Sequence, residues 1–207
     1  IHSDVSGEIS SSIVDSSLHQ HSIIADGVVH STLKSKIGAS SLLMTPGTHL
    51  NLGNSSEFDF GTGDFTLELF VNFNSLNGEQ WIFNNYDFAQ GQHNGFGLRK
   101  ERGSGNIKMI VGSGWKGRVF NTNISANTWV HLAIVGSAGQ IKCYVDGNQV
   151  GSAWNAGYNI SSTKELHMGK QNDLPSGVFN GHLDEIRISK GVARYSASFT
   201  PPSNPLN

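Results

Sequence analysis

The sequence predicts an all-β protein, folded as a jelly-roll sandwich of two antiparallel sheets. In residues 64–74, five apolar side chains alternate with mostly polar ones, which is the period of a strand with one buried face. Short strand candidates follow at regular spacing, separated by turns rich in Gly, Asn and Ser. Glycine is abundant, with 25 copies among 207 residues, and no stretch indicates a helix longer than a turn or two.

The N-terminal region predicts an arm followed by short strands. Residues 1–12 are polar and serine-rich without sustained alternation, so we expect an extended arm or linker before a domain spanning 13–207. An Asp-Gly pair at 26–27 and a Pro-Gly pair at 46–47 predict tight turns. The candidate strands around them are 21–25, 28–32, 41–44 and 49–50.

The middle of the chain predicts a meander with a well-defined core. Phe70 is the aromatic exception on the polar face of the long strand, and we expect it under a loop or a second layer. We assign Trp81, Trp129 and the single cysteine, Cys143, to the core, and one cysteine excludes an internal disulfide. The candidate strands are 80–84, 96–100, 107–111, 118–120, 129–135 and 141–145.

The stretch 183–189 predicts the closing strand. Asp184 has the same parity as Ile186 and Ile188, so its side chain is expected on the apolar side. A buried carboxylate is costly unless something pairs with it, and a cation would do so. The following SKGVARY predicts one helical turn, and the prolines after it end the fold.

Composition excludes several classes of partner. The net charge of -2 and the lack of a basic patch argue against nucleic-acid binding. No apolar run is long enough to insert into a membrane, and no signal peptide is present. Because residue 1 is isoleucine, we expect a processed chain or part of a longer one.

The motif G-x-L-D-E-I-R-I-S-K-G-V-A-R-Y-x-x-x-F-x-P-P, which begins at Gly181, resembles the closing signature of laminin-G-like, concanavalin A-like jelly-roll domains. The resemblance is greatest to the bacterial and phage branch of that superfamily. The stretches 58–78, 127–153 and 165–172 resemble the first long strand, the central hairpin and the penultimate strand of such domains. The resemblance implies the fold, which hosts lectins, enzymes, adhesins and spacers alike.

The resemblance also implies a structural calcium ion. Related domains commonly read Asp-Ser-Ser-Gly-Asn-Gly-His where this chain has DSSLHQH, which keeps Asp15 but places Leu18-His19-Gln20 in the loop. Asp15, Asp184 and backbone carbonyls are the expected Ca²⁺ ligands, and the ion would clamp the two ends of the domain. The alternative is that Asp184 caps a turn or pairs with a nearby Arg or Lys.

We expect no catalytic activity. Glucanases with this fold place three acids on one strand as E-x-D-x-x-E, and the nearest match here is Glu57, Asp59 and Thr62, which lacks the third acid and precedes the strand. We interpret Glu57 and Asp59 as loop acids. His19 and His21 lack an evident third zinc ligand, so we interpret them as loop histidines.

Loop aromatics and polar residues indicate a ligand site. Aromatic rings stack on the faces of sugars, while Asn, Asp, Arg and His bond the hydroxyls. The alternative is that these residues only cover the ends of the sandwich. The candidate ligand-binding residues are Tyr86, Asp87, His93, Trp115, Arg118, Trp154, Tyr158, Asn172 and Asp173.

The sequence therefore predicts a non-catalytic recognition module, extracellular or at the cell surface, that binds a glycan or cell-surface polysaccharide. One alternative is a structural, decoration or host-adsorption module of a phage or virus particle, with coat or tail proteins as partners. The other is an accessory domain of a secreted polysaccharide-degrading enzyme or adhesin.

Overall fold

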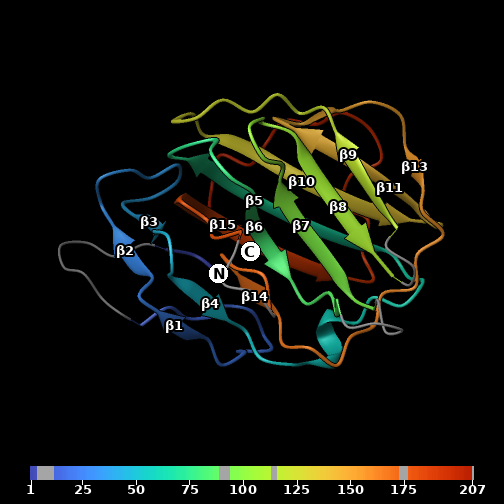
Figure 1. Ribbon diagram of the computed structural model, residues 1–207, viewed down its shortest axis with the longest axis horizontal. Helices are drawn as coiled ribbons and strands as arrows, with labels where there is room; N and C mark the ends of the chain where they lie inside the picture. The colour runs from blue at the N-terminus through green and yellow to red at the C-terminus, as the bar shows by residue number, and fades with distance from the viewer. Residues whose placement is uncertain (4–11, 89–93, 113–115, 173–176, 207) are drawn as a thin grey trace.

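Two antiparallel sheets packed face to face make up the protein in the computed structural model (Figure 1). A single turn of 3-10 helix, η1 (Ser56–Phe58), is the only helical element among the described residues. No helix in that part of the chain has the length and apolar character needed to cross a membrane. The structure describes residues 1–3, 12–88, 94–112, 116–172 and 177–206.

The seven-stranded sheet, here the front sheet, faces the viewer in Figure 1. Its strand order is β1-β4-β14-β6-β7-β8-β9, so the late strand β14 lies between two early ones. Its strands are β1 (Ile24–Asp26), β4 (His49–Asn51), β14 (His167–Met168), β6 (Gln80–Asn84), β7 (Phe96–Lys100), β8 (Ile107–Val111) and β9 (Gly117–Phe120).

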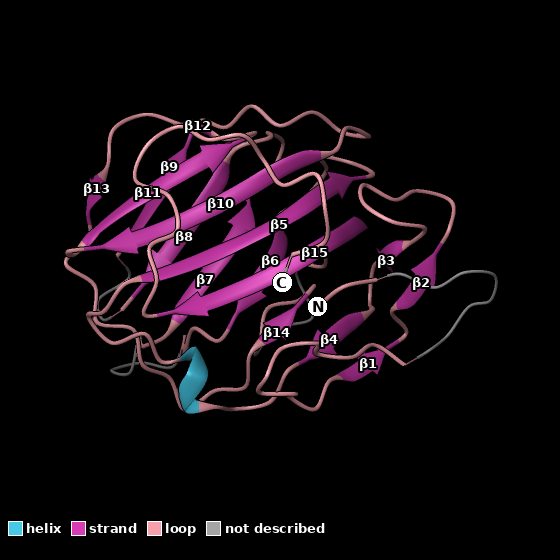
Figure 2. Cartoon of the chain, turned by 180° about the vertical axis from the view of Figure 1, so that it is seen from behind, coloured by secondary structure: helices cyan, strands magenta, loops and turns pink. Residues whose placement is uncertain are grey.

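The eight-stranded sheet, here the back sheet, faces the viewer in Figure 2. Its order is β12-β11-β10-β5-β15-β3-β2, with β13 paired to β11, so the first long strand and the closing strand are central neighbours. Its strands are β2 (Val29–Ser31), β3 (Ser41–Met44), β5 (Phe65–Phe73), β10 (Val130–Ser137), β11 (Gln140–Val145), β12 (Asn148–Gln149), β13 (Trp154–Asn155) and β15 (Gly181–Lys190).

The core lies between the sheets and confirms the predicted fold class. Along β5, the alternating apolar side chains are fully buried, because they face the inner side of the front sheet. Cys143 is also buried, and burial raises the pKa of its thiol to about 12. The cysteine is therefore the small core residue that the sequence predicted. Phe70 lies on the outer face of the back sheet, beneath the Lys36 ammonium, as expected for a residue under a loop.

The predicted orientation of Asp184 is wrong because β15 contains a β-bulge. The register against β5 shifts between Asp184 and Arg187, and Glu185 has a left-handed φ of 48°. The extra residue restarts the alternation, so Asp184 pairs with Phe70 on the outer face whereas Ile186 joins the core. Parity counting fails wherever a strand inserts an extra residue.

Two further predictions were wrong in the same region. The SKGVARY stretch forms no helix, and residues 191–206, here the C-terminal segment, have no regular secondary structure. Trp129 is only half-buried, and its ring lies edge-on to His182, with centroids 6.3 Å apart.

Trp81 is fully buried, but it packs with Tyr86 and Ile110 in a cluster separate from the main core.

Candidate functional site

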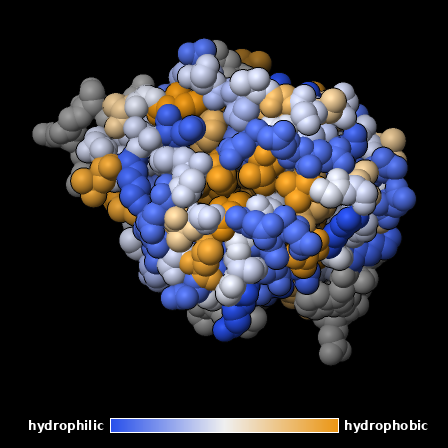
Figure 3. All heavy atoms as spheres, turned by 90° about the horizontal axis from the view of Figure 1, so that it is seen from above, coloured by the Kyte–Doolittle hydropathy of each residue, from blue (hydrophilic) through white to orange (hydrophobic). Residues whose placement is uncertain are grey.

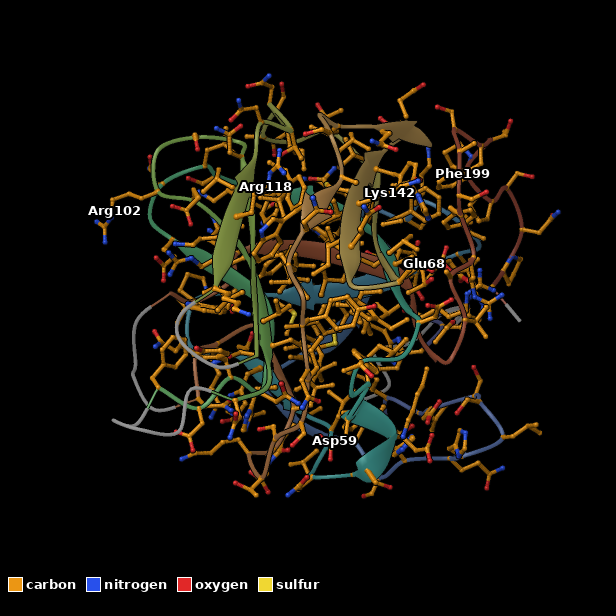
Figure 4. All side chains as sticks on the ribbon, turned by 90° about the vertical axis from the view of Figure 1, so that its right-hand side faces the viewer. Asp59, Glu68, Arg102, Arg118, Lys142 and Phe199 are labelled. Atoms are coloured by element: carbon orange, nitrogen blue, oxygen red, sulfur yellow. The ribbon has the colours of Figure 1, made fainter. Side chains whose placement is uncertain are left out.

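The C-terminal segment covers the outer face of the back sheet, over the buried carboxylate of Glu68 (Figure 4). Arg187 donates to Glu68 Oε1 from Nε at 2.8 Å and lies 2.7 Å away through Nη2. The Tyr195 hydroxyl donates to Oε2 at 2.7 Å, and His131 Nε2 lies 3.4 Å from the same oxygen. The carboxylate is therefore held by partners from β10, β15 and the segment.

The electrostatics of this network follow from its partners. Burial alone would raise the pKa of Glu68, but the nearby His131 ring and the hydrogen bonds from Tyr195 and Arg187 hold it below its usual value. Burial, together with the neighbouring carboxylate of Glu68, raises the pKa of Tyr195 to about 12. The network is thus charged, with its acid ionised at neutral pH, while both ring nitrogens of His131 are buried without a hydrogen-bond partner among the described residues.

Aromatic packing completes the closure. Tyr195 and Phe199 stack with centroids 3.5 Å apart, and both rings lie edge-on to Tyr144. The Phe199 amide donates to the Gly147 carbonyl at 2.9 Å. Gly147 has φ +77°, and a Cβ there would lie 1.8 Å from the Phe199 carbonyl oxygen, so only glycine permits this approach. The closing signature of the sequence therefore serves to cover this face.

The outer face of the front sheet carries a group of polar side chains from β4, β6, β14 and their loops. They lie along the row in which His167 pairs with Asn51 on one side and Asn84 on the other. We name this group the β14 patch. Its members are His49, Asn51, Asn84, Asp87, Lys164, Glu165, His167 and Asn172.

Hydrogen bonds fix the orientation of the groups in the β14 patch. Asn172 Nδ2 donates to the backbone carbonyl of Glu165 at 3.0 Å, so its Oδ1 must accept from His167 Nδ1 at 2.6 Å. In the neutral imidazole, Nε2 is then the acceptor. Asn51 Nδ2 donates to Glu165 Oε2 at 2.9 Å, and Lys164 Nζ lies 3.9 Å from Asp87 Oδ1.

Asn84 is the unsatisfied member of the patch. Its Oδ1 accepts from the Tyr86 amide at 2.9 Å, but its buried Nδ2 has no partner among the described residues. Its cross-strand neighbours are His167 on β14 and Gly97 on β7, and glycine offers no side-chain acceptor. A buried polar group without a partner costs free energy, so the unpaired Nδ2 beneath the patch needs an explanation.

The two histidines of the patch favour the neutral form. Burial lowers the pKa of His167, and Lys170 lowers it further. The pKa of His49 is lowered by the same two causes. The two rings lie 5.6 Å apart. Neutral imidazoles present both a donor and an acceptor, as sugar hydroxyls require.

The structure brings some of the predicted ligand-binding residues together and not others. Asp87 and Asn172, from loops far apart in the sequence, both belong to the β14 patch. Tyr86 and Tyr158 are buried, with 0% and 2% of their surface exposed, so neither presents a ring face for stacking. Trp115, His93 and Asp173 lie outside the described residues.

Trp154 and Arg118 lie at the side of the sandwich. Trp154 is half-buried and packs against the core, and the Arg118 guanidinium lies over the Phe120 ring, 5.4 Å from its centroid. Arg118 also donates to the Ala153 carbonyl at 3.4 Å and to the Ser152 hydroxyl at 3.3 Å. Internal contacts thus engage both side chains.

Sequence reasoning missed most of the β14 patch, including His49, Asn84 and His167. Their one signal was the presence of polar residues inside short strand candidates. On the face seen from above, apolar residues are interspersed with hydrophilic ones (Figure 3). The exposed large apolar residues among those described are Val14, Leu18, Ile24, Leu33, Val119 and Val192.

The expected calcium ligands do not form one cluster. The Asp15 carboxylate accepts from the backbone and side chains of Ser17 and His21 at 2.8–2.9 Å. Burial would raise the pKa of Asp15, but these hydrogen bonds lower it below its usual range. The His21 imidazole and the donors of Ser17 thus occupy the carboxylate that the resemblance assigns to calcium.

Asp184 instead lies beside Glu185 and His2, with ligand atoms all within 4.8 Å of one another. Burial raises the pKa of Asp184 to about 6, against hydrogen bonds from the amides of Lys36 and Ile37 that lower it. His2 Nδ1 contacts Glu185 Oε1. Two adjacent buried carboxylates are the oxygen ligands that a hard divalent cation prefers. Their oxygens also accept from the amides of Glu185 and Leu206, so a cation at Asp184 and Glu185 would share them with these internal donors.

Residues 45–194 match the model of the concanavalin A-like lectin/glucanases superfamily. The chain belongs to this superfamily. No curated protein matches the sequence. As expected for this superfamily, solved structures share the fold at low sequence identity.

Three solved structures illustrate the likeness. The binding domain of paraclostridial mosquitocidal protein 1 has a TM-score of 0.68 at 16% identity, with 91% of this chain covered but only 47% of that one. The CBM40 of the Ruminococcus gnavus IT-sialidase, bound to α2,3-sialyllactose, has a TM-score of 0.61 at 13% identity and coverages of 75% and 91%. Domain 4 of AbnA, a GH43 extracellular arabinanase from Geobacillus stearothermophilus, in complex with arabinotriose, has a TM-score of 0.57 at 18% identity and coverages of 83% and 82%.

Proposed function

We propose that this domain is a non-catalytic, extracellular glycan-binding module and that the β14 patch binds the glycan. The observation that carries the proposal is the buried Asn84 amide, whose Nδ2 has no partner among the described residues and which pairs across the strands with His167. Sugar-bound structures of similar fold, with sialyllactose and with arabinotriose, support the ligand class.

The patch can bind sugar hydroxyls through matched donors and acceptors. Asn84 Nδ2 donates to a sugar oxygen, and His167 Nε2 accepts from a hydroxyl. Lys164 and Glu165 at the rim add a cation and an anion, and the side chain of Glu165 is 55% exposed. Each hydroxyl is both donor and acceptor, so an alternating polar surface recognises it.

The test is retention in affinity gels that contain neutral polysaccharides, with arabinan and β-glucan as first probes. We expect His167→Ala and Asn84→Leu to lose retention, because each removes one hydrogen-bonding group. Lys142→Ala, on the opposite sheet, is the control and should be retained like the parent protein. Full retention of both patch variants with an intact fold would contradict the proposal, and release of reducing ends would indicate an enzyme instead.

We also propose that Ca²⁺ binds at Asp184 and Glu185 and stabilises the domain. A cation that binds only the native state raises the melting temperature by mass action. We expect added calcium to raise the melting temperature and chelator to lower it, with both responses lost in Asp184→Ala. Asp15→Ala is the matched control, which should keep the response. An unchanged melting temperature in calcium and in chelator would rule out the clamp.

A further inference from the structure

A second polar row crosses the outer face of the back sheet, beyond the part covered by the C-terminal segment. Asn72 on β5 pairs with His182 on β15. On the other side of β5, Val130 pairs with Val71, which places Trp129 next to Asn72. The segment contacts the rows of Thr66, Glu68 and His131. The row formed by Trp129, Asn72 and His182 lies one step further along the sheet.

Asn72 carries a buried acceptor that lacks a hydrogen-bond partner in the described part of the chain. The residue is 2% exposed, and its Oδ1 is buried without a hydrogen-bond partner among the described residues. Few buried polar atoms lack a partner in native proteins, and such an atom indicates a missing ligand or water. A ligand in this row must therefore present a donor, such as a hydroxyl or an amide N–H.

His182 adds a second acceptor. The Ser41 hydroxyl donates to the Lys34 carbonyl at 2.6 Å, so His182 Nδ1 must donate to Ser41 Oγ at 3.0 Å. Because Nδ1 donates to Ser41, Nε2 is the acceptor nitrogen of the neutral imidazole. The Ser41 proton is directed away from the imidazole, so the pair is not a nucleophile and base.

Positive charge lies beside these acceptors. Amide oxygens of Asn74 and Asn127, at 3.2 and 3.4 Å, hold the Lys34 ammonium, and Lys36 lies over the Phe70 ring. Neither lysine has a carboxylate within 4.0 Å in the described part of the chain. Their charge is therefore available to an anionic group, in a site otherwise lined by acceptors and one indole ring.

We propose that this row is a second saccharide site, which binds an acidic sugar residue. The Lys34 ammonium binds the sugar carboxylate, the half-buried Trp129 ring contacts the apolar face of the sugar, and Asn72 Oδ1 and His182 Nε2 accept from its hydroxyl or amide groups. The site lies on the sheet opposite the β14 patch, so it extends the proposed function to a second face and a charged ligand class.

The test is calorimetric titration with 3′-sialyllactose and trigalacturonic acid, each beside its carboxyl-reduced counterpart. We expect an acid probe to bind at least about tenfold more tightly than its reduced form, and Trp129→Ala and Lys34→Gln to weaken that binding about tenfold. Lys142→Gln removes the same charge elsewhere on this outer face and should bind like the parent protein. Equal binding by Trp129→Ala, or no binding of either acid, would overturn the site.

Asn72→Leu separates a ligand-binding role from a structural one. The variant removes an acceptor without a partner in the described part of the chain, so the melting temperature should stay the same or rise while affinity for the acid probe falls about tenfold. A large fall in melting temperature would mean that Asn72 is structural, and unchanged affinity would overturn its assignment. Retention on neutral polysaccharide gels tests the β14 patch, whereas titration with the acidic sugars tests the site around Trp129. Either proposal can therefore fail without the other.

Discussion

Two regions on the outer faces of the sandwich, the Glu68 network and the β14 patch, handle buried polar groups differently. On the back sheet, Arg187, Tyr195 and His131 surround the Glu68 carboxylate, and the C-terminal segment covers them. On the front sheet, Asn84 keeps a buried donor with no partner among the described residues. The comparison teaches that the most recognisable motif of the chain closes one face, while an inconspicuous strand, β14, organises the other.

The largest expected effect comes from opening the closed network. Glu68→Ala leaves the partly buried guanidinium of Arg187 without its carboxylate, which costs about 3 kcal/mol or more. Glu101→Ala is the matched control, because it breaks the Arg99 ion pair at the front sheet, where Glu101 is 27% exposed, and should cost below about 1 kcal/mol. Urea unfolding measures both values, and equal costs would remove the distinction between the faces.

The second effect is a pH dependence of opposite sign for Asp184 and for the two histidines of the β14 patch. The folded pKa of Asp184 is raised from 3.8 to about 6, so its contribution to stability falls as pH rises through that window, by about 3 kcal/mol at most. The lowered pKa values of His49 and His167 act the other way, because stability falls as pH drops below 6.5. The melting temperature of each variant should be measured from pH 4 to 7. We expect Asp184→Asn to lose the fall in stability with rising pH, and His167→Gln to lose part of the fall in stability at low pH. A pH dependence like that of the parent protein in either variant would contradict the assignment of that residue.

The smallest effect concerns the cover itself. Phe199→Ala removes a stacked ring from the C-terminal segment and should cost about 1–3 kcal/mol, because the ring is only partly buried. Val119→Ala trims a side chain of the front sheet that is 41% exposed, and should cost below about 0.5 kcal/mol. Chemical denaturation would compare the two variants. If Phe199→Ala is equally mild, the segment rests on the sheet without stabilising it.

The sequence predicted the strands well because each follows from local pattern. The alternation in 64–74 became β5, and the candidates at 80–84, 96–100 and 107–111 became β6, β7 and β8 with those bounds. The orientation of Asp184 could not be predicted in the same way. A bulge depends on how two strands pair, and pairing is set by distant residues.

The candidate sites were only partly predictable for a related reason. Asp87 and Asn172 were expected as loop residues, and both lie in the β14 patch. Tyr86 and Tyr158 were expected as stacking rings, but they are buried, because an aromatic next to small polar residues still packs when a neighbouring element offers apolar surface. Trp129 shows the converse, since it is only half-buried although its sequence context resembles a core position.

By itself, the sequence determined the all-β class and the strand spacing, because the period of two and the turn residues act within a few positions. Membership in the concanavalin A-like superfamily follows from the motifs that the chain shares with that superfamily over residues 45–194. Only the tertiary structure decided which sheet face is closed and which polar groups are left without partners. Glu68 meets Tyr195, and His167 meets Asn84, across more than eighty residues of chain. Whether a polar group has a hydrogen-bond partner depends on which distant strands lie beside it, and groups left without a partner are where a ligand can bind.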